Sequence, residues 1–221
     1  MTIAFDLDDT LYQEIEFVRS AYRRICGQDN HRLLSQMMEA KTPAEAFDLA
    51  CESIADLNIQ TTLNIYRNQL PDIVLDARVK GLLEWMKLEI LNLALITDGR
   101  SITQRNKIRA LGLNDYFSDE AIFISEECGH DKTDEYSFLR LMNQHPGDSY
   151  IYIGDNPQKD FLIPNKLGWT TVCLRDKGEN IHSQCFNKLS CEYLPQIIID
   201  DLSQLHQIID DINIKNNGII K

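Results

Sequence analysis

Three aspartates and a threonine, Asp6, Asp8, Asp9 and Thr10, lie close together near the start of the chain. They follow residues 3–5, an apolar run whose length and composition indicate a buried β-strand. Open α/β sheets bind their ligands beyond the carboxyl ends of such strands. Neighbouring carboxylates repel one another, and a divalent metal ion would relieve that repulsion. Because Asp and Thr also favour helix caps, this segment alone fits either a reactive site or an acidic turn.

Polar side chains also follow three later apolar segments, at residues 91–96, 121–124 and 150–153. They are Thr97, Asp98 and Gly99 after the first segment, Lys132 after the second, and Asp155 and Asp160 after the third. The carboxyl ends of parallel strands share one edge of a sheet, so Asp6 and Asp8 should meet four later residues there: Thr97, Lys132, Asp155 and Asp160. Carboxylates suit a hard ion such as Mg²⁺, while a hydroxyl, loop N–H groups and a lysine suit a phosphoryl group.

Between the first two apolar strands the pattern changes to helical spacing. Ile15, Val18 and Tyr22 form part of one apolar stripe, and the segment 42–45, Thr-Pro-Ala-Glu, has the composition of a helix start. Strand-like alternation is absent from residues 12–68. The pattern predicts an all-helical insert of roughly 55–60 residues.

The rest of the chain alternates strands with helices, which predicts an α/β fold with a doubly wound parallel sheet, a Rossmann-like core. Helices are expected at 77–87, 102–111, 135–143 and 202–209, and strands at 91–96, 121–124, 150–153, 170–174 and 197–199. We expect residues 1–14 and 72–212 to form the core and residues 15–71 the helical insert. The polar residues 213–221 are expected to form a flexible tail.

The composition is that of an ordinary globular protein, with 43% hydrophobic and 25% charged residues among 221. A formal charge of −12 argues against nucleic acid or an anionic membrane surface as the main partner, because both favour a basic footprint. A small anionic substrate stays possible, since the local field of a site decides its binding. The sequence has no apolar run of the roughly 18 residues that a membrane span needs.

The six cysteines show no Cys-x-x-Cys pair and no regular framework, which favours reduced thiols in a cytoplasmic protein. No basic, apolar leader precedes the first strand, so we expect no signal peptide. His182, Cys185 and Cys191 could contribute to a zinc site, but no fourth ligand stands at a standard spacing.

These polar clusters match the four motifs of the haloacid dehalogenase (HAD) superfamily, in order and over nearly the whole chain. The matching residues are Asp6-Leu7-Asp8-Asp9-Thr10, Thr97-Asp98-Gly99, Lys132, and Gly154-Asp155-Asn156-Pro157 with Asp160. The helical insert resembles the C1 cap of subfamily I, and the stretches 95–100 and 154–161 resemble a phosphatase-like branch. Thr133 stands where many relatives have proline, a departure that bears only on the start of the following helix.

The resemblance implies a Mg²⁺-dependent phosphatase that hydrolyses a phosphomonoester through an aspartyl-phosphate intermediate. Asp6 is then the nucleophile, and Asp8 protonates the leaving-group oxygen before it activates water. Thr97 and Lys132 complete the implied catalytic set, with Lys132 neutralising charge between Asp6 and the phosphoryl group. Positioning and charge neutralisation of this kind are the main requirements of phosphoryl transfer.

Two binding sets follow from the same resemblance. The phosphate would be bound by side chains and N–H groups of Leu7, Asp8, Thr97, Asp98, Gly99 and Lys132. The Mg²⁺ site would comprise Asp6, the backbone carbonyl of Asp8, Asp155 as a direct ligand, and Asp160 as a support acting through water or Lys132.

The expected substrate is a small phosphorylated metabolite, a sugar phosphate or a nucleotide, because the cap leaves room for a small molecule. A phosphosugar mutase of the same fold shares all four motifs, and a non-catalytic binding protein is a further alternative. A dehalogenase is disfavoured because such relatives lack the second acid, here Asp8. A phosphonatase needs a cap amine, and the cap stretch 12–68 holds a single lysine, Lys41.

The sequence does not identify the substrate, the cap residues that select it, or the oligomeric state. Tyr12 is expected either to line the pocket or to pack in the core. Lys107, Lys159 and Lys166 need no special role in this interpretation.

Overall fold

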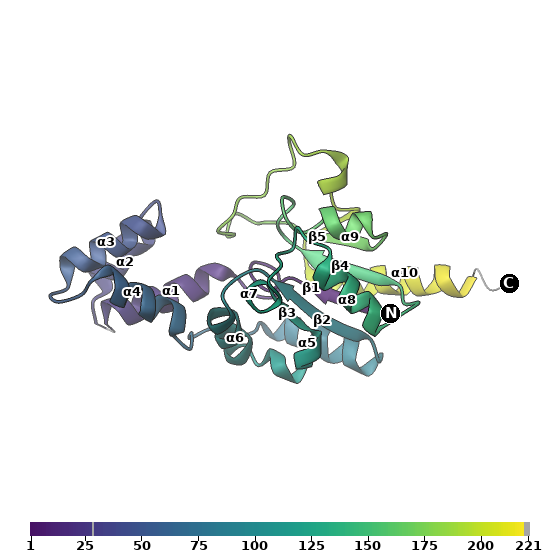
Figure 1. The fold of residues 1–221 in the computed structure, drawn as a ribbon, viewed down its shortest axis with the longest axis horizontal. Helices are drawn as coiled ribbons and strands as arrows, with labels where there is room; N and C mark the ends of the chain where they lie inside the picture. Colours follow the sequence, from purple (N-terminus) through teal and green to yellow (C-terminus); the bar gives the residue numbers. More distant parts are fainter. Residues whose placement is uncertain (28, 219–221) are drawn as a thin grey trace.

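The structure is a computed structural model that describes residues 1–27 and 29–218. Its centre is a six-stranded sheet in the order β3-β2-β1-β4-β5-β6, with every neighbouring pair parallel (Figure 1). The strands are β1 (Thr2–Phe5), β2 (Asn92–Thr97), β3 (Ile122–Ile124), β4 (Tyr150–Gly154), β5 (Thr170–Leu174) and β6 (Ile197–Ile199). The predicted doubly wound parallel sheet is confirmed. It places β1, which ends in the acidic motif, between β2 and β4.

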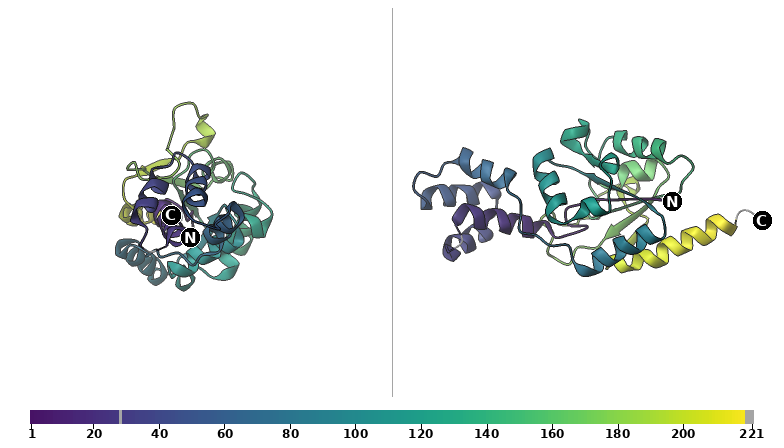
Figure 2. Two further views of the ribbon diagram at one scale, coloured as in Figure 1. Left: turned by 90° about the vertical axis from the view of Figure 1, so that its left-hand side faces the viewer. Right: turned by 90° about the horizontal axis from the view of Figure 1, so that it is seen from below.

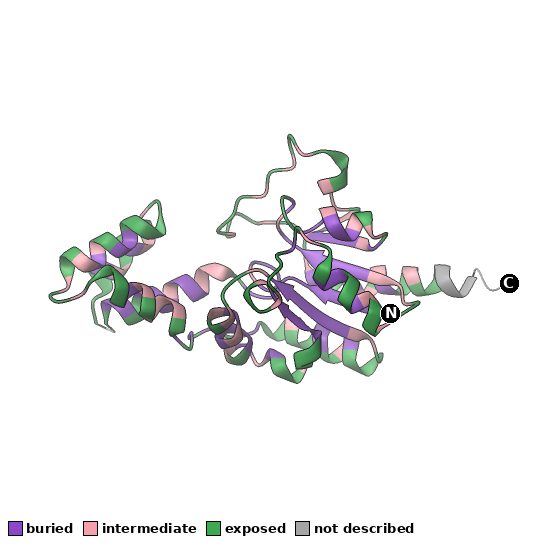
Figure 3. Cartoon of the chain, viewed as in Figure 1, coloured by how far each residue is buried: buried purple, intermediate pink, exposed green. Residues whose placement is uncertain are grey.

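Helices cover both faces of the sheet, and the alternation of side chains along β1 shows how. Ile3 and Phe5 point to one face and Ala4 to the other. The first face packs against α5 (Ala77–Leu88), α6 (Ser101–Ala110) and α10 (Leu205–Gly218), and the second against α8 (Tyr136–Gln144) and α9 (Leu162–Lys166). Figure 3 shows the buried sheet between these layers. The site-bearing strands are therefore held rigidly from both sides.

Four helices between β1 and α5 form a separate bundle, the cap, at one end of the molecule (Figure 2). They are α1 (Glu14–Cys26), α2 (His31–Glu39), α3 (Pro43–Ser53) and α4 (Ile59–Asn68). The predicted start of α3 is confirmed, because the Thr42 side chain accepts a hydrogen bond from the Glu45 N–H at 3.2 Å. The inside of the cap is aromatic, with Tyr66 in edge contact with Phe17 and Phe47.

The last described residues fall in the segment that was expected to form a flexible tail. α10 continues through Gly218, so residues 213–218 are helical, and residues 219–221 lie outside the described part of the chain. The apolar stripe that packs on the core continues to Ile212, one turn beyond the expected end of the helix, which explains the extension.

Short elements complete the connections between strands. They are η1 (Leu113–Asp115), η2 (Asp119–Ala121), α7 (Ser125–Cys128), η3 (Cys191–Tyr193) and η4 (Leu202–Gln204). The six cysteines are all free thiols. None of the described helices has the length and apolar character that crossing a membrane requires.

Candidate active site

Three of the carboxylates predicted to meet at the sheet edge lie side by side in the structure, and the fourth, Asp8, is not in their group. Asp6 follows β1, Asp155 follows β4, and Asp160 lies five residues further on. One carboxylate oxygen from each lies within 4.8 Å of the others, and all three residues are buried. Residues about 150 positions apart in sequence are thus neighbours because β1 and β4 are adjacent parallel strands.

Lys132 joins two of these carboxylates. Its Nζ atom lies 2.6 Å from Oδ1 of Asp6 and 2.9 Å from Oδ1 of Asp160, and the Leu7 N–H donates to the same Asp6 oxygen at 2.6 Å. Burial would lower the pKa of Lys132, but the charges of Asp160 and Asp6 raise it well above its usual value. Burial, with the nearby charges of Asp160 and Asp155, raises the pKa of Asp6 despite Lys132.

Asp160 holds the loop after β4 in place. Its Oδ2 accepts hydrogen bonds from the backbone N–H groups of Asp155 at 3.0 Å and Asn156 at 2.8 Å. A Cβ atom at Gly154 would lie 2.4 Å from the same oxygen, so only glycine fits there. Since its other oxygen contacts Lys132, Asp160 is engaged through both carboxylate oxygens, which suits a supporting role.

Asp155 is positioned by a loop that the sequence did not connect with the site. Its Oδ2 accepts a hydrogen bond from Nδ2 of Asn180 at 2.8 Å. Burial and the charge of Asp160 raise the pKa of Asp155 to about 8. A divalent cation would relieve this crowding, and an all-carboxylate donor set suits Mg²⁺. The residues present therefore fit a metal held by Asp6 and Asp155, with Asp160 behind them.

The segment after β2 supplies the other predicted phosphate contacts. Thr97 is buried, and its Oγ1 accepts a hydrogen bond from Nε2 of Gln104 at 2.7 Å. Asp98 lies beside Lys132, and the backbone N–H of Lys132 donates to Asp98 Oδ1 at 3.0 Å. The Gly99 N–H donates to the Ser125 hydroxyl at 2.9 Å and would have to exchange that partner to bind phosphate. Thr97 is thus held in place by Gln104, and the Gly99 N–H already has a hydrogen-bond partner.

Asp8 is not part of the cluster of three carboxylates and is held by its own set of donors. Oδ1 contacts the Tyr12 hydroxyl at 2.5 Å and Lys107 Nζ at 2.7 Å, and Oδ2 accepts from Gln104 at 2.9 Å. Burial would raise the pKa of Asp8, but Lys107 and these hydrogen bonds lower it overall. Lys107 also contacts Glu14. Burial and the charge of Asp8 raise the pKa of Glu14 to about 7.

Sequence reasoning missed Lys107, Gln104 and Asn180. For the first two a signal was present, because both share with Ile108 the buried side of α6. Two polar residues on a core-facing stripe indicate buried partners. Asn180 lies in the irregular loop between β5 and β6, which offers no periodic pattern to interpret.

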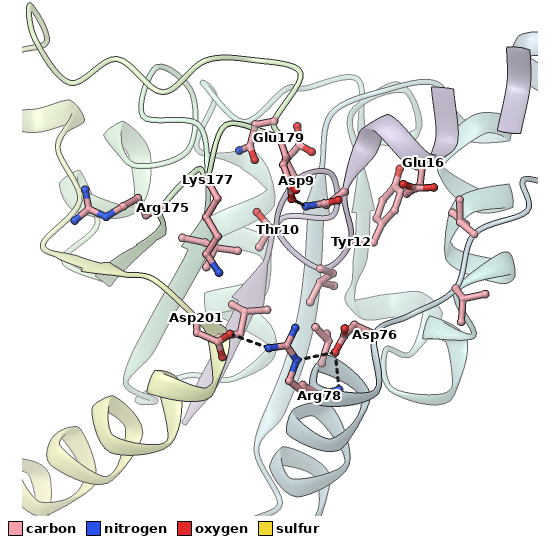
Figure 4. Close-up of a pocket in the computed structure, with 18 of the residues that line it drawn as sticks. Asp9, Thr10, Tyr12, Glu16, Asp76, Arg78, Arg175, Lys177, Glu179 and Asp201 are labelled. Atoms are coloured by element: carbon pink, nitrogen blue, oxygen red, sulfur yellow. Dashed lines mark hydrogen bonds and ion pairs between the residues drawn. The ribbon is translucent and has the colours of Figure 1, made fainter. Parts of the chain in front are cut away.

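A cavity of about 560 Å³ is lined in part by the loop after β1 (Figure 4). Tyr12 packs in the hydrophobic core, as one of the two expectations for this residue had it, and it also lines this cavity together with Asp9. Arg78 pairs there with Asp76 and Asp201. Arg175, which also lines the cavity, pairs with Asp200, and Lys177 is a third cation in the same wall.

A metal site built from cysteine and histidine is not present in the described part of the chain. Among residues 1–27 and 29–218, the one group of acidic, histidine or cysteine side chains close enough to share a metal is Asp6, Asp155 and Asp160. The zinc alternative at His182, Cys185 and Cys191 therefore has no support.

The chain resembles known proteins in sequence and in fold. The chain is 28% identical over 219 residues to a glyceraldehyde 3-phosphate phosphatase from Methanocaldococcus jannaschii, covering 89% of this chain and 94% of that protein. A protein of the same name from Methanopyrus kandleri is 24% identical over 202 residues, covering 78% and 83%. The crystal structure of the magnesium-bound HAD-hydrolase YfnB from Bacillus subtilis has a similar fold, with a TM-score of 0.65 at 22% identity, covering 94% and 97%.

The family model for haloacid dehalogenase-like hydrolases matches residues 3–174, which is more than half of the chain and contains all the polar clusters described above. This match confirms the resemblance predicted from the four motifs. The chain belongs to the haloacid dehalogenase-like hydrolase family.

Proposed function

We propose that this protein is a Mg²⁺-dependent phosphatase that hydrolyses a small phosphorylated metabolite. The observation that carries the proposal is the buried cluster of Asp6, Lys132, Asp155 and Asp160 at the carboxyl edge of the sheet. A nucleophilic carboxylate beside a lysine and a set of acids able to hold a metal is what transfer of a phosphoryl group requires. The family assignment and the names of the two relatives support the same activity.

The first half of the reaction forms a covalent intermediate. An oxygen of Asp6 attacks phosphorus, the bond to the leaving-group oxygen breaks, and Asp8 gives that oxygen a proton. The negative charge of the bound phosphate offsets the Lys107 charge and so favours the protonated form of Asp8 that this step needs. Lys132 stays protonated and offsets the charge between Asp6 and the phosphoryl group. Thr97 binds a phosphoryl oxygen through its hydroxyl. Mg²⁺, when bound near Asp6 and Asp155, supplies further charge neutralisation.

The second half releases phosphate. Asp8, now ionised, removes a proton from water, the water oxygen attacks phosphorus, and the bond from Asp6 to phosphorus breaks. Both halves use Asp8 from the same position, so the three donors that hold its carboxylate matter throughout the cycle.

Among small metabolites we favour short sugar phosphates, with glyceraldehyde 3-phosphate as the first compound to test, because both relatives named above act on it by name. A panel of sugar phosphates and nucleotides, assayed for release of inorganic phosphate, tests this choice. We expect Mg²⁺-dependent release that EDTA abolishes and added Mg²⁺ restores.

The same panel separates the alternatives. Isomer formation without phosphate release would identify a phosphosugar mutase of this fold. Binding of a phosphorylated compound without turnover, with Mg²⁺ present, would identify a protein that retained the fold for binding. Either result would contradict the proposed phosphatase.

A further inference from the structure

Lys107 is the most deeply buried cation on α6 and contacts both the core and the cap. Its Nζ lies 2.7 Å from Oδ1 of Asp8, 3.5 Å from Oε1 of Glu14 and 4.4 Å from the centroid of the Phe17 ring. The Lys107 side chain is 3% exposed. A buried ammonium is costly unless paired, so this position is maintained by specific partners.

Gln104 lies one turn before Lys107 on the same helix and holds the other oxygen of Asp8. Its Nε2 donates to Asp8 Oδ2 at 2.9 Å and to Thr97 Oγ1 at 2.7 Å. With Tyr12 and Lys107 on Oδ1, both oxygens of Asp8 are fixed, and so is the plane of the carboxylate. Gly99 permits this arrangement, because a Cβ at that residue would lie 3.0 Å from Cγ and Cδ of Gln104.

α6 also holds the end of the cap. The Thr103 hydroxyl donates to the carbonyl of Arg67 at 3.0 Å. The Asn106 side chain donates to the carbonyls of Asn68 at 3.1 Å and Gln69 at 2.9 Å. Because Glu14 and Phe17 belong to the first cap helix, α6 contacts the cap at both of its connections to the core. Lys107 is therefore oriented from the cap side while it holds Asp8 on the core side.

We propose that Lys107 and Gln104 are positioning residues that hold the Asp8 carboxyl group in line with the leaving-group oxygen. The proposal rests on the phosphatase function proposed above. In the step concerned, the proton of Asp8 passes to the leaving oxygen while the bond from that oxygen to phosphorus breaks. Lys107 keeps its own protons and adds no atom to the reaction. Its contribution is orientation, and a displacement of about 1 Å at such a group lowers rates by about 100-fold.

The test compares substrates that differ in their need for a proton. The p-nitrophenolate group leaves without protonation, whereas an alkyl oxygen, as in glycerol 3-phosphate, requires the acid. We expect Lys107→Met to lower kcat/KM about 100-fold on the alkyl phosphate and less than about 10-fold on p-nitrophenyl phosphate. Lys107→Arg, which keeps the charge, should recover part of the difference.

Arg105→Gln is the matched control, because it removes a different cation from the same helix. Arg105 pairs with Glu127 and Asp119 and not with Asp8. We expect it to leave the ratio of the two kcat/KM values unchanged. Gln104→Leu removes no charge and repeats the test if Lys107→Met fails to fold. An equal loss on both substrates, or no loss, for these two variants would overturn the positioning role. A wild-type protein that releases phosphate from neither substrate, nor from the sugar-phosphate panel, would instead contradict the phosphatase itself.

Discussion

The sheet edge and the cap are built from different interactions. At the edge, Asp6 and Asp160 share Lys132, and Asp160 is fixed further by two backbone N–H groups. In the cap, aromatic rings pack edge to face around Tyr66, and the helices contact the site through Glu14 and Phe17. Charged groups with fixed partners keep one geometry, while apolar packing tolerates repacking. We therefore propose that the edge carries out the chemistry and that the cap selects the substrate.

The largest expected effect is at the edge. We predict that Asp6→Asn lowers kcat by at least about 10³-fold, because the amide cannot act as the nucleophile. In the wild type, burial and neighbouring acids raise the pKa of Asp6, so the ionised Asp6 carboxylate destabilises the metal-free fold at neutral pH. Thermal stability should therefore be unchanged or higher in the variant, measured by calorimetry without metal. Asp210→Asn, at an exposed position, is the control, and activity within tenfold of wild type would contradict the assignment.

Weakening the cap should act differently. Phe47 is buried between Tyr22 and Tyr66, and we predict that Phe47→Ala costs about 3 kcal/mol of packing. Amide hydrogen exchange should accelerate in α1–α4 and stay slow in β1 and β4, because the sheet keeps both of its helical layers. Ile59→Ala, at an exposed cap position, should leave both regions unchanged. Equal acceleration in sheet and cap would show that the two regions unfold as one unit.

The same contrast decides what the sequence could predict. Asp6 and Asp155 were placed together correctly because strand ends in a parallel sheet share one edge, whatever the loops do. Lys107 was given no role, although its helix was predicted, because its partners depend on how α6 packs against α1. Asn180 belongs to a loop whose path no local pattern specifies. Prediction succeeded where topology fixes position and failed where tertiary packing does.

A substitution at Asn180 tests whether the loop between β5 and β6 contributes to the function of the carboxylate cluster at the sheet edge. Its side chain donates to Asp155 Oδ2, and we predict that Asn180→Ala weakens Mg²⁺ binding about tenfold, a typical cost of removing a group that orients a metal ligand. Titration calorimetry with Mg²⁺, and the rise in melting temperature that the ion produces, measure the effect. Asn187→Ala, at an exposed position of the same loop, is the control. Unchanged affinity would assign Asn180 to loop structure alone.

The smallest effect is expected at the opposite end of the same strands. Asp148 accepts hydrogen bonds from the Thr2 hydroxyl at 2.7 Å and from Asn92 at 3.0 Å. Burial opposes ionisation there, but these bonds lower the pKa of Asp148 overall. A lowered pKa means that the ionised form stabilises the fold above the usual Asp pKa of about 4 and loses this effect as the pH falls through the folded value.

We therefore predict that Asp148→Asn lowers the free energy of unfolding by about 1 kcal/mol at pH 7, and that the difference from wild type shrinks below about pH 4. Urea unfolding at several pH values measures it, with Asp210→Asn as the control for loss of an exposed acid. Catalytic constants at neutral pH should not change, because Asp148 lies at the amino end of β4 and the reacting carboxylates lie at the carboxyl end. A loss of activity without loss of stability would contradict this separation, since it would make the amino ends of the strands part of the site.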